Sequence, residues 1–516
     1  MGKWMDGYLE RLNRVRLDNL AGGGAERLNV QKRLGKLTAR ERIDMLVDAG
    51  AFEEIGALVT DPRPPFDGRM RPSPSDGVVM GFGRVDGKML ALCAMDFSVM
   101  SGSLGSQAAW KLADWVETAG QKRMPVILMC DSAGVRIGIK SGDCGLAGLG
   151  RFIKTYSRYS GVIPRISLVL GPCMGLMAAV AGLSDFLIMT EDTSFLWYGG
   201  EKTSDEAGTA EFHMEKSGQC DLIARDDEEA LRQVKDLLRF LPGSCWETPP
   251  FEESGDDPER REAALLDVMP DDPKFTYDIH EIIDLIVDEG TFLELKADYA
   301  CHLVIGFCRF GGRVVGLVAN NPDELSGILE PDSSDKYDRF MRFLDAFNIP
   351  LVTLVDTTAF PPGDRWERMG VIRHGAKLLH SYAHLTCPKI TMVLRRSYGG
   401  ANIVLGCSRM FPDLVYTWPT AEFAPTGPET VVHAVFHKAL ARAKEEGNYD
   451  EVFNQFLTIL KEQFSVMTLA KTWTSYYTAH EVIDPRDTRP RIIRALEAVR
   501  NKHETLPEKK RSIAPA

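Results

Sequence analysis

The 516-residue sequence lacks the marks of several protein classes. Its ten cysteines include no CxxC pair, which argues against a zinc ribbon or a disulfide scaffold and favours free thiols in a reducing compartment. The net charge of −12 argues against a nucleic-acid-binding surface, because such surfaces need clustered basic residues. The charged, amphipathic start of the chain has no apolar core of a signal peptide. These absences favour a cytoplasmic protein that binds no nucleic acid.

Long apolar runs and familiar catalytic motifs are also missing. Residues 166–183 are uncharged and about as long as a minimal membrane span. Gly171-Pro172 would break a helix there, and Asp185 follows, so we expect buried core. Motifs of the GxGxxG or GxxxxGK[ST] type are absent from strand–helix junctions, as are HExxH and GxSxG. We therefore expect neither a nucleotide-phosphate site, a metal site, nor a side-chain nucleophile.

What the sequence does contain is a repeat. Four segments of the first half, at 46–56, 77–96, 124–134 and 163–180, recur in the same order at 286–296, 302–321, 349–360 and 387–404. One pair is MPVILMCDSAG and IPLVTLVDTTAF, which places Asp131 opposite Asp356. Another is IPRISLVLGPCMGLMAAV and CPKITMVLRRSYGGANIV, which places Gly175 opposite Gly399. The shared order and the nearly constant offset indicate an internal duplication.

The duplication predicts two α/β domains. Apolar strands such as 126–129 and 351–355 alternate with helical stretches, which is typical of buried, mostly parallel sheets. The first predicted domain, with an N-terminal helical arm, covers 1–250, and a linker rich in acidic residues and proline covers 251–275. The second predicted domain covers 276–503, and a loose tail covers 504–516.

The predicted strands in both halves end in loops of small residues. The loops contain Gly134 and Gly175 in the first half and Ala359 and Gly400 in the second. Small residues let a ligand approach the backbone, and N–H groups at a helix start attract negative charge. Two such loops side by side would present converging donors, as in an oxyanion hole. Tight strand-to-helix turns would also need glycine, and this remains the alternative for each loop alone.

Long motifs in both halves resemble one known family. They include GKLTARERIDMLVDAGAFEEIG (35–56), CDSAGVRI (130–137), GVIPRISLVLGPC (161–173), GVIRHGAKLL (370–379), YGGAN (398–402) and YTWPTAE (416–422). The chain resembles, over about residues 10 to 500, the carboxyltransferase (beta) subunit of biotin-dependent acyl-CoA carboxylases and the alpha subunit of biotin-dependent acyl-CoA decarboxylases, in the crotonase superfamily. The resemblance implies two tandem crotonase-like domains, an acyl-CoA side followed by a biotin side, in a dimer to homohexamer.

The resemblance also implies a reaction. A carboxyl group would move between carboxybiotin on a carrier protein and the alpha carbon of an acyl-CoA of the propionyl-CoA or methylmalonyl-CoA type, through a CoA enolate. The biotin carboxyl carrier protein and biotin carboxylase would be separate chains, because the sequence has no Met-Lys-Met biotinylation motif and no room for an ATP-grasp domain. One alternative is the alpha subunit of a sodium-pumping glutaconyl- or methylmalonyl-CoA decarboxylase, with a membrane decarboxylase subunit. Another is a non-catalytic homologue.

Site residues follow from the resemblance position by position. The backbone donors for the thioester would be Gly134, Val135, Gly175 and Leu176, and those on the biotin side Ala359, Phe360, Gly400 and Ala401. Cofactor contacts would come from Lys36, Arg40, Ser101, Gly102 and Ser103 for CoA, and from Tyr398 and Gly399 in the second half. A solvated helix face is the alternative for Lys36 and Arg40. Larger residues than the family's usual ones stand at Ala133, Val135, Met174, Leu176 and Met177, where they would reshape the acyl pocket, and at Ala359 on the biotin side.

Overall fold

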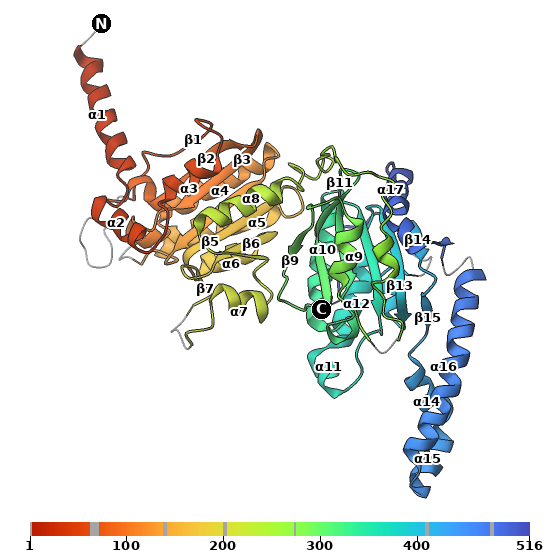
Figure 1. Ribbon diagram of the computed structural model, residues 1–516. Helices are drawn as coiled ribbons and strands as arrows, with labels where there is room; N and C mark the ends of the chain where they lie inside the picture. The colour runs from red at the N-terminus through yellow and green to blue at the C-terminus, as the bar shows by residue number, and fades with distance from the viewer. Residues whose placement is uncertain are drawn as a thin grey trace. The chain divides into compact units, whose positions relative to one another are not determined.

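The computed structural model describes residues 3–61, 72–137, 142–199, 204–272, 275–407, 412–474 and 479–515, without the side chains of 142–145 and 462–474. The chain divides into two compact units, Met1–Thr248 and Pro249–Ala516 (Figure 1). Among the helices of the described residues, none is long and apolar enough to span a membrane. The uncharged segment 166–183 instead contributes to a buried strand and a short helix, β5 (Arg165–Met174) and α6 (Leu176–Gly182), as expected.

Unit 1 is built on one sheet in the order β1-β2-β3-β4-β5-β6-β8, with β7 paired to β5. The strands β1 to β3 are antiparallel, and the remaining pairings are parallel. The other strands are β1 (Glu53–Glu54), β2 (Val78–Val85), β3 (Lys88–Met95), β4 (Val126–Ser132), β6 (Phe186–Thr190), β7 (Phe195–Trp197) and β8 (Leu222–Ala224). The other helices are α1 (Lys3–Leu20), α2 (Ala25–Arg33), α3 (Ala39–Leu46), α4 (Ser106–Gln121), α5 (Gly142–Arg158), α7 (Ala210–Glu215) and α8 (Asp227–Leu238).

Unit 2 repeats this topology, with the sheet order β16-β14-β13-β12-β11-β10-β9 and β15 paired to β13. Its strands are β9 (Leu293–Leu295), β10 (Leu303–Phe310), β11 (Arg313–Asn320), β12 (Leu351–Thr357), β13 (Lys389–Tyr398), β14 (Leu414–Thr417), β15 (Glu422–Ala424) and β16 (Glu481–Val482). Its helices are α9 (Ile279–Ile286), α10 (Pro331–Ala346), α11 (Asp364–Met369), α12 (Val371–Tyr382), α13 (Ala401–Val404), α14 (Pro428–Val435), α15 (His437–Glu446), α16 (Tyr449–Thr474) and α17 (Thr488–Ala498). The prediction of two α/β domains from an internal duplication is confirmed.

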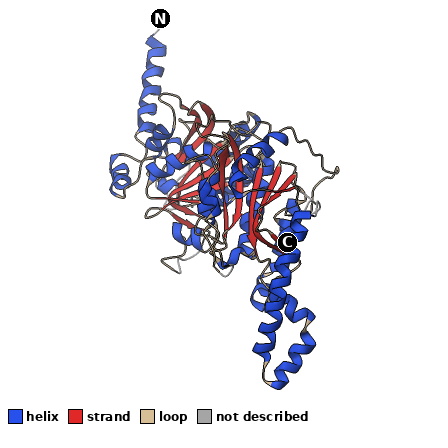
Figure 2. Cartoon of the chain, turned by 45° about the vertical axis from the view of Figure 1, so that its right-hand side comes forward, coloured by secondary structure: helices blue, strands red, loops and turns tan. Residues whose placement is uncertain are grey.

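Each unit has its own hydrophobic core. The cores are formed by side chains of the strands and helices drawn in red and blue in Figure 2. In unit 1, Leu112 and Trp115 of α4 belong to the same buried cluster as Leu128 of β4. In unit 2, Ile282 of α9 and Val352 of β12 belong to another. Because β4 and β12 are buried along their whole length, their sequences are apolar runs rather than alternating patterns.

The first hairpin of each unit is held by the same device. In unit 1 the carboxylate of Asp48 accepts the N–H groups of residues 86 and 87, at 2.9 and 3.0 Å. In unit 2 the carboxylate of Asp288 accepts those of residues 311 and 312, at 2.9 and 2.7 Å. All four turn residues have positive φ, which explains the Asp-Gly and Gly-Gly turns seen in the sequence.

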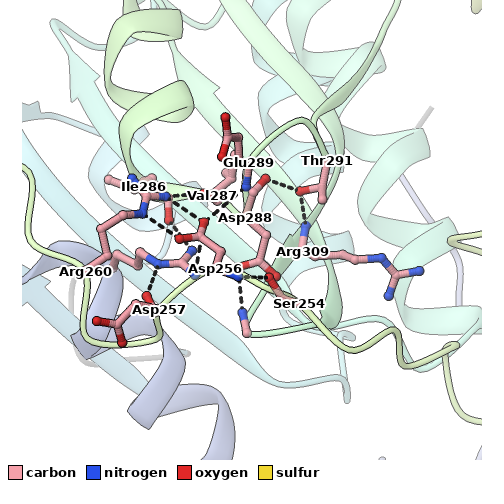
Figure 3. Close-up of polar contacts among 12 residues, drawn as sticks. Ser254, Asp256, Asp257, Arg260, Ile286, Val287, Asp288, Glu289, Thr291 and Arg309 are labelled. Carbon is pink, nitrogen blue, oxygen red and sulfur yellow. Dashed lines mark hydrogen bonds and ion pairs between the residues drawn. The ribbon is translucent and has the colours of Figure 1, made fainter.

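The acidic stretch predicted as a linker is bound to unit 2 by charged contacts (Figure 3). The guanidinium of Arg260 pairs with Asp256 at 2.8 Å and donates to the carbonyl of Val287 at 2.8 Å. Arg489 of α17 pairs with Asp288 at 2.7 Å and with Asp256 of the acidic stretch at 3.4 Å. The acidic stretch and α17 therefore contact each other through these carboxylates.

Candidate active site

The predicted thioester loops of unit 1 follow two neighbouring parallel strands. Strands β4 and β5 lie in register from residue 126, and beyond a register shift Ser132 pairs with Cys173. Gly134 follows the first strand and Gly175 the second, and both have positive φ, 90° and 63°. A Cβ atom on Gly134 would lie 3.0 Å from the carbonyl oxygen of Met174. The two loops therefore touch, and glycine is needed at 134 for both conformation and space.

The hydrogen bonds of these loops narrow the choice of donors. The N–H of Gly134 donates to Ser132 Oγ at 3.1 Å, and the N–H of Gly175 donates to the carbonyl of Trp197 at 3.0 Å. Within the described residues, the next two N–H groups, those of Val135 and Leu176, have no hydrogen-bond partner. Of the four predicted donors, Val135 and Leu176 are the two whose N–H groups stay available to a ligand.

A buried ion cluster underlies these loops. Asp131, one residue before Ser132, lies 2.6 Å from Lys36 Nζ and 3.1 Å from Arg42 Nη1. Arg42 also binds Asp227, at 2.7 Å, and the carbonyl oxygen of Leu170. Burial lowers the pKa of Lys36 and raises the pKa of Asp131, and each charge partly offsets this for the other. Lys36, which precedes α3, and Arg42, which lies in α3, thus place two positive charges at the ends of β4 and β5.

This cluster also accounts for the glycine of Gly171-Pro172. A Cβ atom at Gly171 would lie 2.4 Å from Lys36 Nζ, so any larger residue would displace the ammonium group. Arg40, the other basic residue predicted to contact CoA, binds Glu54 through Nη1 and Nη2, at 2.7 and 3.1 Å. Lys36 and Arg40 thus each form an ion pair with a carboxylate of unit 1, and their contact with CoA stays a prediction.

The segment Ser101–Ser103 lies against the predicted thioester loop after β4, and its contact with CoA stays a prediction. The N–H of Ala133 donates to the carbonyl of Ser101 at 3.0 Å, and Ser132 Oγ donates to that of Gly102 at 2.7 Å. A Cβ atom on Gly102 would lie 2.1 Å from the carbonyl oxygen of Asp131. The structure therefore brings these two predicted parts of the site together.

Unit 2 builds a second pair of loops in the same way. The N–H of Ala359 donates to Thr357 Oγ1 at 3.3 Å, and that of Gly399 donates to the carbonyl of Ala424 at 3.0 Å. For the N–H groups of Phe360, Gly400 and Ala401, the described part of the chain offers no partner. The Phe360 ring lies beside Gly400, where a Cβ atom would be 3.5 Å from it.

In unit 2 the buried carboxylate equivalent to Asp131 is that of Asp356, and its basic partners come from the neighbouring strand. Asp356 is fully buried and binds Arg395 at 2.9 Å and Arg396 at 2.7 Å, both from β13. These arginines replace Gly171 and Pro172 of the first copy. Sequence reasoning missed them as site residues, although a pair of charges in place of Gly-Pro at the repeat offset was a usable signal.

Tyr398 is buried, and its hydroxyl donates to Glu422. Burial, together with the adjacent Glu422 carboxylate, raises the pKa of Tyr398 above its usual range, so the phenol stays protonated. Its contact with a cofactor stays a prediction. Among the described side chains, no group of three or more His, Cys, Asp or Glu could hold a metal ion.

Comparisons with known proteins agree with this geometry. A family model for the carboxyl transferase domain matches residues 30–513. The propionyl-CoA carboxylase carboxyltransferase subunit of Haloferax mediterranei is 37% identical over 99% of each chain. The methylmalonyl-CoA decarboxylase subunit alpha of Veillonella parvula is 35% identical over 98% of this chain and 97% of its own. The crystal structure of transcarboxylase 12S with methylmalonyl-coenzyme A and methylmalonic acid bound superposes with a TM-score of 0.90, at 38% identity, over 100% of this chain and 99% of its own.

Proposed function

Because the chain belongs to the carboxyl transferase domain family, we propose that unit 1 handles an acyl-CoA and unit 2 handles biotin in one carboxyl transfer. The chain is a carboxyltransferase of the kind found in biotin-dependent acyl-CoA carboxylases. The observation that carries the proposal is that each unit, at the same place in its fold, presents N–H groups without a partner among the described residues: those of Val135 and Leu176 in unit 1 and those of Phe360, Gly400 and Ala401 in unit 2.

In unit 1 the Val135 and Leu176 N–H groups would bind the thioester oxygen. Negative charge grows on this oxygen when the alpha proton leaves and the enolate forms, so fixed donors stabilise the transition state more than the ground state. One such donor contributes about 3 kcal/mol in well-studied enzymes. The carboxylate–cation cluster around Asp131 holds the ends of β4 and β5 that carry both donors.

The residues of unit 2 fit biotin, which a separate carrier chain would bring. Phe360 and Gly400 offer N–H groups for a ureido oxygen that have no partner in the described part of the chain, and the Phe360 ring supplies an apolar wall. Arg395 and Arg396 both bind the buried carboxylate of Asp356 in β12, the strand that leads to Phe360. When bound, biotin supplies the transferred carboxyl group and the base for the alpha proton. The chain's own part is to bind, orient and stabilise charge.

We propose a short acyl group of the propionyl-CoA or methylmalonyl-CoA type as substrate. Val135 and Leu176, larger than the residues usual at these positions, are both partly buried and pack on the core of unit 1. Substrates of this size are named for the Haloferax relative and are bound in the transcarboxylase 12S structure.

Decarboxylation is the second candidate, since the Veillonella relative is a methylmalonyl-CoA decarboxylase subunit. The same donors serve both directions, because the enolate lies between the acyl-CoA and its carboxylated form. In either role we propose a cytoplasmic homo-oligomer, a dimer up to a hexamer like that named for transcarboxylase 12S. Its partners would be a biotin carboxyl carrier protein with biotin carboxylase, or a membrane decarboxylase subunit.

The test uses the purified chain with free biotin and malonyl-, methylmalonyl- and glutaconyl-CoA, following loss of the carboxyl group. We expect the highest turnover with methylmalonyl-CoA. Absence of both turnover and calorimetric binding across the panel would contradict the proposal and leave a non-catalytic homologue.

A matched pair of variants tests the thioester donors. Leu176 is the first residue of α6, a position where proline is tolerated, so Leu176→Pro removes the N–H without breaking the helix. We expect a loss of about 100-fold to 1,000-fold in kcat. The control Leu176→Ala keeps the N–H and should retain most of the activity.

A further inference from the structure

Arg136 follows the thioester loop and is almost fully buried, with 7% of its side chain exposed. Its guanidinium spans three separate segments. Nε and Nη2 donate to the Oγ and the carbonyl oxygen of Ser103, at 3.2 and 2.7 Å. Nη1 binds the carboxylate of Asp76 and that of Asp61, the latter at 3.3 Å. One side chain thus ties the predicted CoA-contacting loop to the turn before β2.

The backbone around Val135 makes this contact relevant to the donor. The N–H of Leu104 donates to the carbonyl of Gly134 at 2.8 Å, and the N–H of Arg136 donates to the carbonyl of Leu104 at 2.9 Å. Val135 lies between these two bonds, so the path of Ser103 and Leu104 sets the direction of the Val135 N–H, which has no partner among the described residues. A displacement of Ser103 would therefore be transmitted to the donor.

The second copy shows that the fold does not need this contact. Ser101 and Ser326 occupy equivalent loops with φ of 56° and 57°, and the N–H of Leu329 reaches the carbonyl of Ala359 as that of Leu104 reaches Gly134. At the repeat offset of 225, however, Arg136 is replaced by Pro361 and Asp76 by Cys301. The bond from the first loop to the second thus forms without the arginine, whereas the bond made by the Arg136 N–H has no counterpart at Pro361. The guanidinium contacts with Ser103 and Asp76 are therefore specific to unit 1.

We propose that Arg136 is a positioning residue for the acyl-CoA half of the reaction, locking Ser101–Ser103 to the Val135 donor. The inference rests on the proposed function of unit 1. Contacts made by the CoA portion of the substrate at the first loop would then help to place the thioester oxygen at the second. A misplacement of about 1 Å at a reacting centre can cost about 100-fold in rate.

The test compares Arg136→Met and Arg136→Lys with the wild-type chain, using methylmalonyl-CoA and free biotin. We expect Arg136→Met to lose about 100-fold in kcat/KM for the CoA substrate, with both kcat and KM affected, and to keep the KM for biotin. Arg136→Lys should be intermediate, because an ammonium group can neutralise Asp76 but lacks the fork that reaches Ser103.

Arg165→Met is the matched control. Arg165 is equally buried in unit 1 and pairs with Asp185 at 2.7 Å, but it stands at the other end of β5 from the loops. Its loss should lower stability and leave kcat and both KM values close to wild type. Equal kinetic losses in the two methionine variants, or a parallel rise in the KM for biotin, would mean that Arg136 is only structural and would overturn the inference.

Two further measurements keep the outcomes separate. Should Arg136→Met not fold, the double variant Arg136→Met/Asp76→Asn removes one of the two carboxylate charges that lose their contact with the guanidinium, and the same kinetic pattern is expected. Amide hydrogen exchange at Leu104 and Arg136 should accelerate in the folded variant, whatever its activity, and unchanged exchange would overturn the inference. Inactivity of the wild-type chain with every CoA thioester would instead contradict the proposed function.

Discussion

Lys36 and Asp131 form a buried ion pair, with 2.6 Å between Nζ and Oδ2, at the end of the strand that leads into the predicted thioester loop. The lysine comes from the segment between α2 and α3, and the carboxylate comes from β4. In the second copy the equivalent Asp356 is met by Arg395 and Arg396 from the neighbouring strand. The buried carboxylate is thus common to both copies, whereas the source of its cations has changed.

Lys36→Met should therefore destabilise unit 1. The variant leaves Asp131 with Arg42 alone, and breaking a buried pair by removing one partner costs about 3 kcal/mol. The change is measured from the urea midpoint of the full-length chain. Lys32→Met is the control, because Lys32 pairs with Glu41 at the surface, where an ion pair contributes less than about 1 kcal/mol. Equal shifts in the two variants would contradict a stabilising role for the buried pair.

Ala359 should be a point of backbone strain. Its φ of 118° lies in a region that residues with a side chain rarely adopt, and Gly134 occupies the equivalent position of the first copy with φ of 90°. Ala359→Gly should raise the stability of unit 2 by about 1 kcal/mol, seen as a higher melting temperature.

The reverse substitution in the first copy is the counterpart. Gly134→Ala should lower stability, because it combines the same strain with a Cβ atom 3.0 Å from the carbonyl oxygen of Met174. A melting temperature that falls in Ala359→Gly would show that the loop is shaped by the alanine methyl group rather than strained by it.

Much of this architecture could be predicted from the sequence, because a duplication repeats strand order as well as residues. The match of residues 77–96 to 302–321 predicted hairpins that the structure has as β2–β3 and β10–β11. The sequence alone could not tell which N–H groups are available to a ligand. The N–H of Gly134, and not that of Val135, donates to Ser132 Oγ, and this depends on the path of the loop past Ser132. The ion clusters were missed because their partners are distant in sequence, with Arg42 and Asp131 89 positions apart.

His280 should make unit 2 sensitive to pH. Its imidazole binds Glu294 at 2.9 Å and Asp278 at 2.6 Å, and these contacts, the one with Glu294 first, raise the pKa of His280 to about 9. The pKa is raised above the unfolded value, so the stabilisation is complete below about pH 6.5 and is lost as the pH rises through about 9. The urea midpoint of the wild-type chain, compared with that of His280→Gln, should show this difference shrinking between pH 6.5 and 9.

The first copy suggests the control for this prediction. Arg40 and Glu54 stand at the positions equivalent to His280 and Glu294, and they form a bidentate ion pair. His280→Arg should therefore keep its stabilisation across the same pH range, because a guanidinium group does not lose its proton there. A pH dependence that survives unchanged in His280→Arg would assign it to another group.

Gly400→Pro should impair the predicted biotin side in unit 2 without affecting the predicted acyl-CoA side in unit 1. Gly400 has φ of −67°, which proline also adopts, and its N–H has no partner among the described residues, so the substitution removes a donor without breaking an existing hydrogen bond. We expect carboxyl transfer with biotin to fall by about 100-fold to 1,000-fold while calorimetric binding of methylmalonyl-CoA stays unchanged. Gly400→Ala retains the N–H, and its Cβ atom would make an ordinary contact, 3.5 Å from the Phe360 ring, so it should remain active. Equal activity in the proline and alanine variants would exclude Gly400 as a donor on the biotin side and leave Phe360 and Ala401 as the remaining candidates.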